Sequence, residues 1–272
     1  MDVSPSRQPR SDQLFGTTVP DHLQTQPNDK FPRTRWSVLD AARGNDPAER
    51  ERALETLFAA YWKPVYKYVR LRWNRSPEDA QDLTQGFFIE LLERALLARY
   101  DPEKSRLRTY LRLCVDSFVM NQTKAAQRLK RGGTALHIAL DFEAAEGELR
   151  SAAIDVASIP SPSVDDYFEK EWIRSLFTLA VEDLRQLCEA RGRQKTFQIF
   201  EEYDLEAADD ISYAQLAAKY SLPLTDVTNA LAWARREFRT IALDHLREIC
   251  GSYDEFQREV LSVFGKQARD AG

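Results

Sequence analysis

Hydrophobic residues recur every three or four positions along most of the chain, which is the spacing of one face of an α-helix. Stripes of this kind run over residues 53–71, 77–93 and 107–119 and resume over 164–246. Strand-like alternation of apolar and polar residues is nowhere convincing. The pattern therefore predicts an all-α fold with two helical parts.

The clearest helix start lies around position 76. Ser76 can cap the first turn, and Pro77 suits the first helical position. The carboxylates of Glu78 and Asp79 would then stand at the positive end of the helix dipole. The Tyr-Asp-Pro sequence at 100–102 breaks the helical pattern before the next stripe begins.

A chain of 272 residues has room for two domains of ordinary size with a linker and tails. Residues 1–33 are rich in Ser, Pro, Gln and Asp, and we expect a disordered arm there. We expect a first helical domain over 34–131, a flexible linker over 132–164 and a second helical domain over 165–250. An amphipathic helical tail would occupy 251–272.

The charge of the chain at first argues against nucleic-acid binding. The net charge is −5, whereas a free-standing DNA-binding domain is usually basic. The two signs are segregated, however, because basic residues concentrate in 99–131 and acidic ones in 141–166. A positive block beside a negative segment makes the average uninformative, so nucleic acid stays among the candidate partners.

The sequence gives no sign of export or membrane insertion. Its first fifteen residues lack the apolar core of a secretory signal, and no run approaches eighteen apolar residues. The cysteines at 114, 188 and 250 are odd in number and far apart, which favours reduced thiols. We therefore expect a cytoplasmic location.

Residues 212–239 predict a helix, a tight turn and a second, longer helix. The turn falls at 221–224, and Thr225 would cap the second helix. Leu216, Val227 and Leu231 would lock the two helices together. This is the plan of a DNA-reading helix-turn-helix, although an ordinary helical hairpin in a bundle has the same spacing.

The two helices before the linker offer further binding chemistry. The 77–93 helix has an acidic, Gln-containing face beside an apolar one, which on its own could be a solvated face over a core. The next helix carries cations at both ends with aromatic residues between them. Cations for the backbone and flat rings for bases suit single-stranded DNA, although basic helix ends are often plain surface.

These segments carry a family resemblance. Residues 77–88 (PEDAQDLTQGFF) resemble the most characteristic stretch of domain two of the RNA polymerase sigma factors, specifically the extracytoplasmic-function type. Residues 101–111 (DPEKSRLRTYL) resemble the segment that melts and reads the minus-ten element. Residues 34–39 and 131–133 resemble a planctomycete-type subgroup. The resemblance spans about 34–248 and implies sigma domain two over 34–131 and sigma domain four, with its helix-turn-helix, over 165–250.

The resemblance also implies roles for individual residues. Contacts with the clamp of the polymerase β′ subunit would come from Asp79, Asp82, Leu83, Gln85 and Phe88. Contacts with the minus-ten element would come from Arg106, Arg108, Thr109, Tyr110, Arg112, Asn121, Lys124 and Arg128. Contacts with the minus-thirty-five element would come from Thr225, Thr228, Asn229 and Arg235.

The last of these sets departs from the family pattern. Related factors usually carry Lys or Arg where Thr228 stands, and more basic residues where Ala232 and Trp233 stand. Trp233 could pack against the preceding helix or form an exposed partner surface. Fewer cations mean weaker attraction to the DNA backbone. We therefore expect promoter recognition to rely mainly on the minus-ten element.

The resemblance implies a sigma factor that directs core RNA polymerase to promoters and assists their melting. Its partners would be core polymerase, duplex promoter DNA and the melted non-template strand, with an anti-sigma factor left open and no membrane. We expect no enzyme activity, cofactor or metal. His22 lies in the expected disordered arm, His137 lies in the expected linker, and His245 has no Cys or Asp partner at ligand spacing. No phosphate loop or nucleophile motif is present. The alternative is a sigma-derived helix-turn-helix regulator, or a polymerase-binding adaptor without initiation activity of its own.

The tail after Cys250 also leaves two interpretations. Its apolar residues, which recur at helical spacing, could pack onto the second domain. The tail could instead make a regulatory contact that replaces or recruits an anti-sigma partner.

Overall fold

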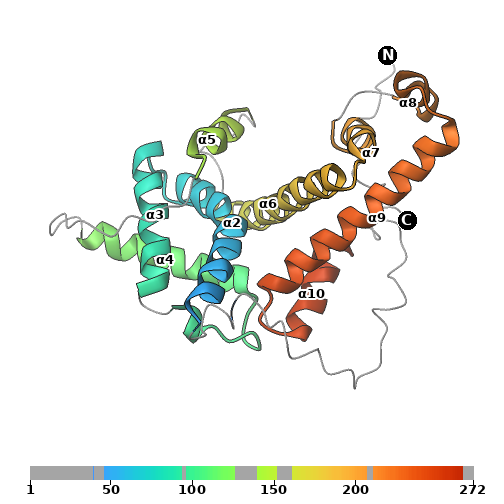
Figure 1. Ribbon diagram of the computed structural model, residues 1–272. Coiled ribbons are helices and arrows are strands. Elements are labelled where there is room, and N and C mark those ends of the chain that lie inside the picture. The colour runs from blue at the N-terminus through green and yellow to red at the C-terminus, as the bar shows by residue number, and fades with distance from the viewer. Residues whose placement is uncertain are drawn as a thin grey trace, which may run out of the picture. The chain divides into compact units, whose positions relative to one another are not determined.

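The computed structural model describes residues 39, 46–93, 96–125, 140–151, 161–206 and 211–265. Every element within these ranges is a helix, which confirms the all-α prediction (Figure 1). In chain order the elements are α2 (Pro47–Arg72), α3 (Pro77–Glu93), η3 (Leu96–Arg99), α4 (Leu107–Ala125), α5 (Phe142–Ser151), α6 (Ser161–Ala190), α7 (Gln194–Phe200), η5 (Glu201–Leu205), α8 (Tyr213–Tyr220), α9 (Leu224–Ile249) and α10 (Tyr253–Phe264).

The chain forms two compact units. Of the described residues, those between 39 and 179 and between 246 and 259 form the larger unit, and those between 180 and 245 and between 260 and 265 form the smaller unit. The larger unit thus extends beyond the 34–131 expected for the first domain. It takes in most of α6 because Trp172 of that helix is buried against Tyr61 of α2, with ring centroids 6.2 Å apart.

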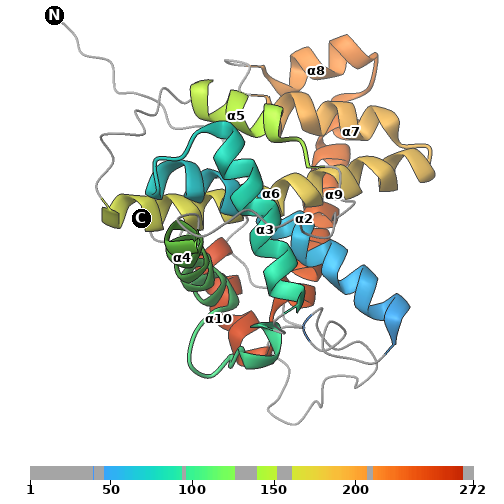
Figure 2. The same cartoon turned by 90° about the vertical axis from the view of Figure 1, so that its left-hand side faces the viewer.

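The core of the larger unit lies where α2, α3 and α4 pack together (Figures 1 and 2). Helix α2 continues through Pro64 without ending there. Phe58 of α2 meets Phe88 of α3 edge to face, with ring centroids 4.7 Å apart. Helices α3 and α4 approach closely at Gly86, where an added Cβ atom would lie 3.1 Å from the ring of Phe118. The absence of a side chain at Gly86 therefore permits this packing.

Helix α5 lies inside the segment that we expected to be a flexible linker. Phe142 at its start packs against Trp62 and Tyr66 of α2, with ring centroids 5.6 Å and 5.1 Å away. Glu146 of α5 accepts hydrogen bonds from Arg70 and Tyr66. These contacts anchor the middle of the expected linker to α2. Its residues 161–164 form the start of α6, and its residues 132–139 and 152–160 lie outside the described residues.

The smaller unit contains the helix, turn and helix that the sequence predicts. Ser212 and Gln215 form a capping box at the start of α8, and Ser221 ends that helix in the left-handed conformation, with φ of 53°. Helix α9 begins at Leu224, one residue before the expected cap. Leu216 of α8 and Val227 of α9 are fully buried, as expected for residues that hold the two helices together.

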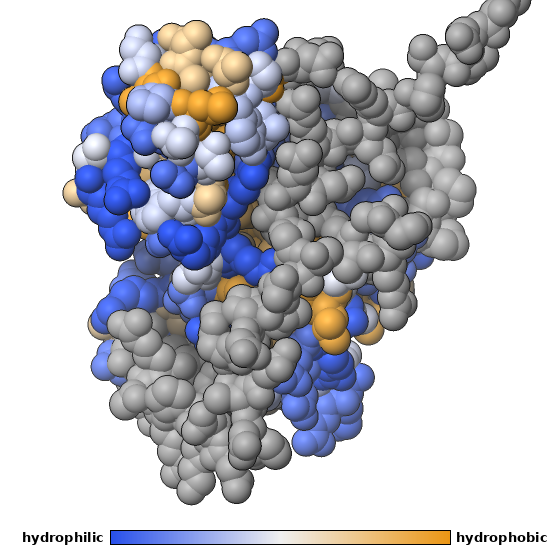
Figure 3. Space-filling model, turned by 90° about the vertical axis from the view of Figure 1, so that its right-hand side faces the viewer, coloured by the Kyte–Doolittle hydropathy of each residue, from blue (hydrophilic) through white to orange (hydrophobic). Residues whose placement is uncertain are grey.

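The described residues on the face drawn in Figure 3 are mainly hydrophilic, with hydrophobic residues in small groups. This agrees with the mean hydropathy of −0.51. Among the described residues, every helix falls short of the length and apolar character that crossing a bilayer requires.

Candidate nucleic-acid interface

Helix α3 presents a polar outer face. Asp79, Asp82 and Gln85 recur at a spacing of three and are exposed, and Leu83 beside them is half-buried. The hydroxyl of Ser76 accepts a hydrogen bond from the Asp79 amide at 3.1 Å, which confirms the predicted cap. The cap fixes the first turn, so these side chains project from a rigid helix.

Phe88 does not belong to this face, contrary to our expectation. Its side chain is 1% exposed and packs against Phe58 and Phe87. The buried residues Ala80, Thr84 and Leu91 lie three to eight positions away on the same side of α3. Phe88 therefore forms part of the core and has no surface for a partner.

The start of α4 holds two of the expected strand-binding arginines. Arg108 is 1% exposed, and its Nη2 atom lies 3.2 Å from Oε2 of Glu259. Its guanidinium group also lies over the ring of Trp172, 4.8 Å from the centroid. Arg106 is half-buried, with its Nε atom 3.7 Å from Oε1 of the same glutamate. Arg108 therefore has no exposed surface for DNA in this structure, contrary to our expectation, because Glu259 and Trp172 cover it.

The next residues of α4 are more accessible. Arg112 is half-buried, and its Nη1 atom pairs with Oδ1 of Asp165 at 2.6 Å. Thr109 and Tyr110 are also half-buried. The hydroxyl of Tyr110 donates a hydrogen bond to the carbonyl oxygen of Leu96 at 2.7 Å.

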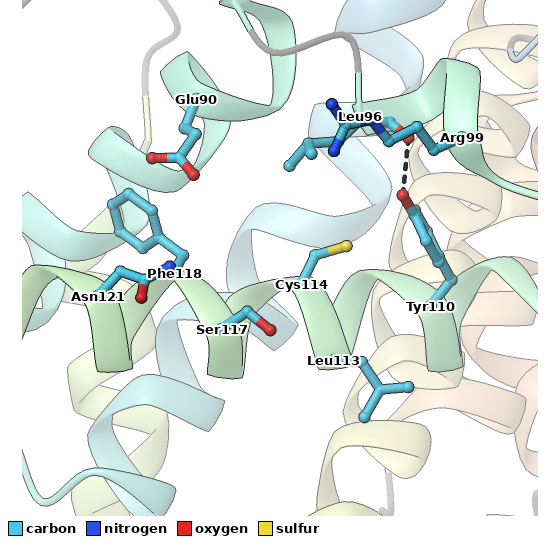
Figure 4. Close-up of a pocket in the computed structure, with 9 residues that line it drawn as sticks. All are labelled: Glu90, Leu96, Arg99, Tyr110, Leu113, Cys114, Ser117, Phe118 and Asn121. Atoms are coloured by element: carbon cyan, nitrogen blue, oxygen red, sulfur yellow. Dashed lines mark hydrogen bonds between the residues drawn. The ribbon is translucent and has the colours of Figure 1, made fainter.

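A groove of about 380 Å³ lies between α3, η3 and α4 (Figure 4). Tyr110, Cys114 and Phe118 point into it from one face of α4, toward Arg99 of η3 and Glu90 of α3. Burial raises the pKa of the Cys114 thiol, which therefore stays neutral. The remaining lining residues are Leu96, Leu113, Ser117 and Asn121. Two rings, an amide and a guanidinium group around an apolar floor can hold a planar, hydrogen-bonding group such as a base.

The far end of α4 is only partly described. Asn121 is exposed and lines the groove. Lys124 lies within α4, and Arg128 falls outside the described residues.

The expected duplex-reading residues divide into two groups. Thr225, Thr228 and Asn229 are exposed at the start of α9. Arg235 instead pairs with the carboxylate of Asp204, at 3.0 Å and 2.9 Å. It lies one residue after the buried Ala234 and turns toward the interior, so it acts in holding α9 to η5 and not as an exposed cation.

Two cations that lie near α9 were not among the DNA-binding residues expected from the sequence. Arg193 and Arg191, in the turn between α6 and α7, lie over the ring of Trp233 at 4.5 Å and 6.0 Å from its centroid. Both arginines are exposed, and Trp233 is half-buried. The two positions stand about forty residues before Trp233, so no local spacing could have indicated the contact.

Comparison with protein families identifies the segment that contains α3 and the groove. Residues 57–129 match the family model described as sigma-70 region 2. No curated protein and no solved structure matches the chain. The matched segment holds most of α2, all of α3 and all of α4, and so includes both the exposed acidic face and the basic helix. Residues 57–129 are therefore similar to region 2 of the sigma-70 proteins.

Proposed function

We propose that the protein is a sigma factor of the extracytoplasmic-function type that directs core RNA polymerase to specific promoters in the cytoplasm and assists their melting. The observation that carries the proposal is the sigma-70 region 2 match over 57–129. The resemblance of residues 34–39 and 131–133 supports the planctomycete-type subgroup.

In this proposal, the outer face of α3 binds the clamp of the β′ subunit. Asp79, Asp82 and Gln85 are exposed and lie on a capped helix, which supports their role as contacts. Leu83 beside them adds a half-buried apolar surface. Such a face suits a basic, partly apolar protein partner.

The groove between α3, η3 and α4 would receive a base of the melted non-template strand. A base that leaves the duplex stack needs a pocket with rings and hydrogen-bonding groups. Tyr110, Phe118 and Asn121 supply these groups, and Arg99 supplies a cation for the backbone. Thr109 and Arg112 lie on the same helix beside the groove, and Lys124 and Arg128 follow it toward the duplex.

Helix α9 of the smaller unit would contact the minus-thirty-five element. Thr225, Asn229 and Arg236 lie four and seven positions apart in sequence, so they share one exposed face of the helix. Trp233 flanks this face, and the guanidinium groups of Arg191 and Arg193 lie over its ring. These two arginines would add contacts with phosphates to that of Arg236.

One observation favours the adaptor, which would bind polymerase without reading DNA. Arg108 is buried and Arg112 is paired with Asp165, so two of the expected strand contacts are engaged within the chain. The adaptor and the sigma factor share polymerase binding but differ in promoter opening. The experiment must therefore measure both.

The test combines a pull-down with core polymerase and transcription from a library of supercoiled promoters. The wild-type protein should bind core enzyme and direct initiation. Binding to core polymerase without initiation would favour the adaptor. Binding to duplex DNA, with neither polymerase binding nor initiation, would favour the helix-turn-helix regulator. Failure in both measurements would overturn the sigma assignment.

A matched pair of variants tests the polymerase-binding face. Asp82→Ala should weaken binding to core enzyme about tenfold, because an exposed contact in the interface is lost. Asp166→Ala removes the same charge from an exposed position of α6 and should leave binding unchanged. Equal effects of the two substitutions would show that general charge, and not the α3 face, governs the association.

A further inference from the structure

We propose that the segment Gly251–Glu259 covers the strand-binding end of α4 and must move away before region 2 can hold a melted strand. This inference rests on the proposed function, because it concerns the regulation of the same site. The covering segment lies at the start of α10, beside the first turn of α4 in both ribbon views (Figures 1 and 2).

Glu259 forms ion pairs with Arg106 and Arg108 at the start of α4. One of its carboxylate oxygens lies 3.2 Å from Nη2 of Arg108, and the other lies 3.7 Å from Nε of Arg106. Glu259 is itself 2% exposed. A guanidinium group that faces a buried carboxylate is closed to a phosphate of DNA, which would need the same donors.

Glu255 accepts hydrogen bonds from backbone amides at the same place. Its Oε1 atom accepts hydrogen bonds from the amide of Leu107 and the hydroxyl of Tyr100, both at 2.7 Å. Its Oε2 atom accepts a hydrogen bond from the amide of Gly251 at 2.8 Å. The amide of Leu107 opens α4, and the start of a helix attracts anions. The two glutamates thus place carboxylates where an anionic strand would meet the first turn of α4.

Further contacts close the segment over α4. Arg258 donates a hydrogen bond to the carbonyl oxygen of Pro102 at 2.9 Å. Phe256 is buried, with the guanidinium group of Arg247 5.2 Å from its ring centroid. Gly251 passes so close to Leu39 and Tyr100 that an added Cβ atom would lie 3.1 Å from each. Defined contacts therefore hold the segment in place, and its polar contacts lie at the basic end of α4.

The electrostatics of the covering segment favour its release from α4. Burial raises the pKa of the Glu259 carboxyl, although Arg108 and Arg106 oppose the effect. The charged form of Glu259 is therefore held at a desolvation penalty that part of the ion-pair energy must offset. When the segment leaves, the carboxylates regain water and Arg106 loses its ion pair with Glu259 and becomes available to the strand. Arg108 loses Glu259 as well, but it keeps Glu169 of α6 at 3.8 Å and the ring of Trp172. Because the strand and the segment carry the same charge and need the same donors, binding of one excludes the other.

The test compares two substitutions on α10 in the full chain. Glu259→Gln removes the charge that faces Arg106 and Arg108, while Asp254→Asn removes a charge from an exposed position of the same helix. Binding of a short fluorescent single-stranded DNA is measured by anisotropy. Glu259→Gln should raise the affinity by on the order of tenfold, within the usual range of coupling between sites. Asp254→Asn should leave it unchanged.

The outcomes separate this inference from the proposed function. If wild type and both variants bind core polymerase and initiate transcription, yet Glu259→Gln binds the strand no better than Asp254→Asn, the covering role is overturned. If none of the three binds core polymerase or initiates transcription, the proposed function itself fails.

Hydrogen exchange on the unmodified protein gives a second measurement that does not depend on the stability of a variant. Amides of residues 253–259 should exchange faster when the single-stranded DNA is bound than when it is absent. Unchanged protection of this segment in the DNA-bound protein would show that the strand binds without displacing it, and would overturn the inference.

Discussion

The ammonium group of Lys67 lies 2.6 Å from the carboxylate of Glu171, and both side chains are 1% exposed. The pair joins α2 to α6 inside the larger unit. Glu148 of α5 approaches the same ammonium group at 2.6 Å, and Arg174 approaches Glu171. A buried charge of this kind contributes to a specific arrangement of helices only while its partner is present.

Removal of the ammonium group should therefore destabilise the protein strongly. We expect Lys67→Met to lower the free energy of unfolding by about 3 kcal/mol, because Glu171 would remain buried without its main partner. Lys63→Met removes an ion pair with Glu148 at a more exposed position and should cost less than about 1 kcal/mol. Urea denaturation of both variants checks the difference. Equal losses would mean that the Lys67 pair contributes no more than a surface ion pair.

Arg108→Ala should act mainly on stability. The substitution leaves Glu259 buried without its nearest cation and removes the guanidinium group from the Trp172 ring. We expect a loss of about 3 kcal/mol or more, measured by urea denaturation. Arg106→Ala, at the half-buried neighbour, should change stability far less. Arg106 and Arg112 are consequently better positions than Arg108 for testing promoter opening, and a fully stable Arg108→Ala variant would contradict this view of the buried cluster.

The stability of the α2–α5 contact should depend on pH. The hydrogen bond from Arg70 holds the pKa of the Glu146 carboxyl below its ordinary value of 4.5. A carboxyl whose pKa is lower in the folded state than in the unfolded state stabilises the fold fully above the unfolded value. This stabilisation is lost as the pH falls below about 4.5 toward the folded value.

Glu146→Gln provides the measurement. The variant should be less stable than wild type near neutral pH, and the difference in unfolding free energy should shrink as the pH falls through this window. Urea denaturation at a series of pH values gives the difference directly. A difference that stays constant across the window would mean that Glu146 does not titrate between the two states.

The turn before α7 offers a test of duplex binding. Arg193→Ala should weaken binding to duplex DNA about equally for all sequences and reduce the slope of log affinity against log salt by about one, because one phosphate contact is lost. Arg150→Ala removes an exposed arginine of α5 and should leave the slope unchanged. Titrations at several salt concentrations distinguish the two results. A sequence-dependent loss for Arg193→Ala would instead indicate contact with bases.

Local signals in the sequence predicted the helices well. The start of α3 depends on Ser76 and its own neighbours, and the capping hydrogen bond forms within three residues. The turn between α8 and α9 is equally local. The buried apolar face of α9 could be predicted because its period matches that of the helix.

Contacts between distant parts of the chain could not be predicted in this way. Arg108 meets Glu259 about 150 positions later, and Arg235 meets Asp204 31 positions earlier. Both arginines look like exposed cations when only their neighbours in sequence are considered. Phe142 likewise stands in a segment with the composition of a linker, and only its packing against Trp62 and Tyr66 reveals a docked helix.

The larger unit is discontinuous, since its last part, residues 246–259, comes after residues 180–245 of the smaller unit. During synthesis, α4 leaves the ribosome well before Glu255, which supplies the acceptor for the amide of Leu107. The first turn of α4 thus obtains this acceptor only after a further 148 positions of the chain have been made. Contacts between such distant positions form slowly, because a long loop must close first. During synthesis the start of α4 is therefore without Glu255 and Glu259 until the segment that carries them has also been made.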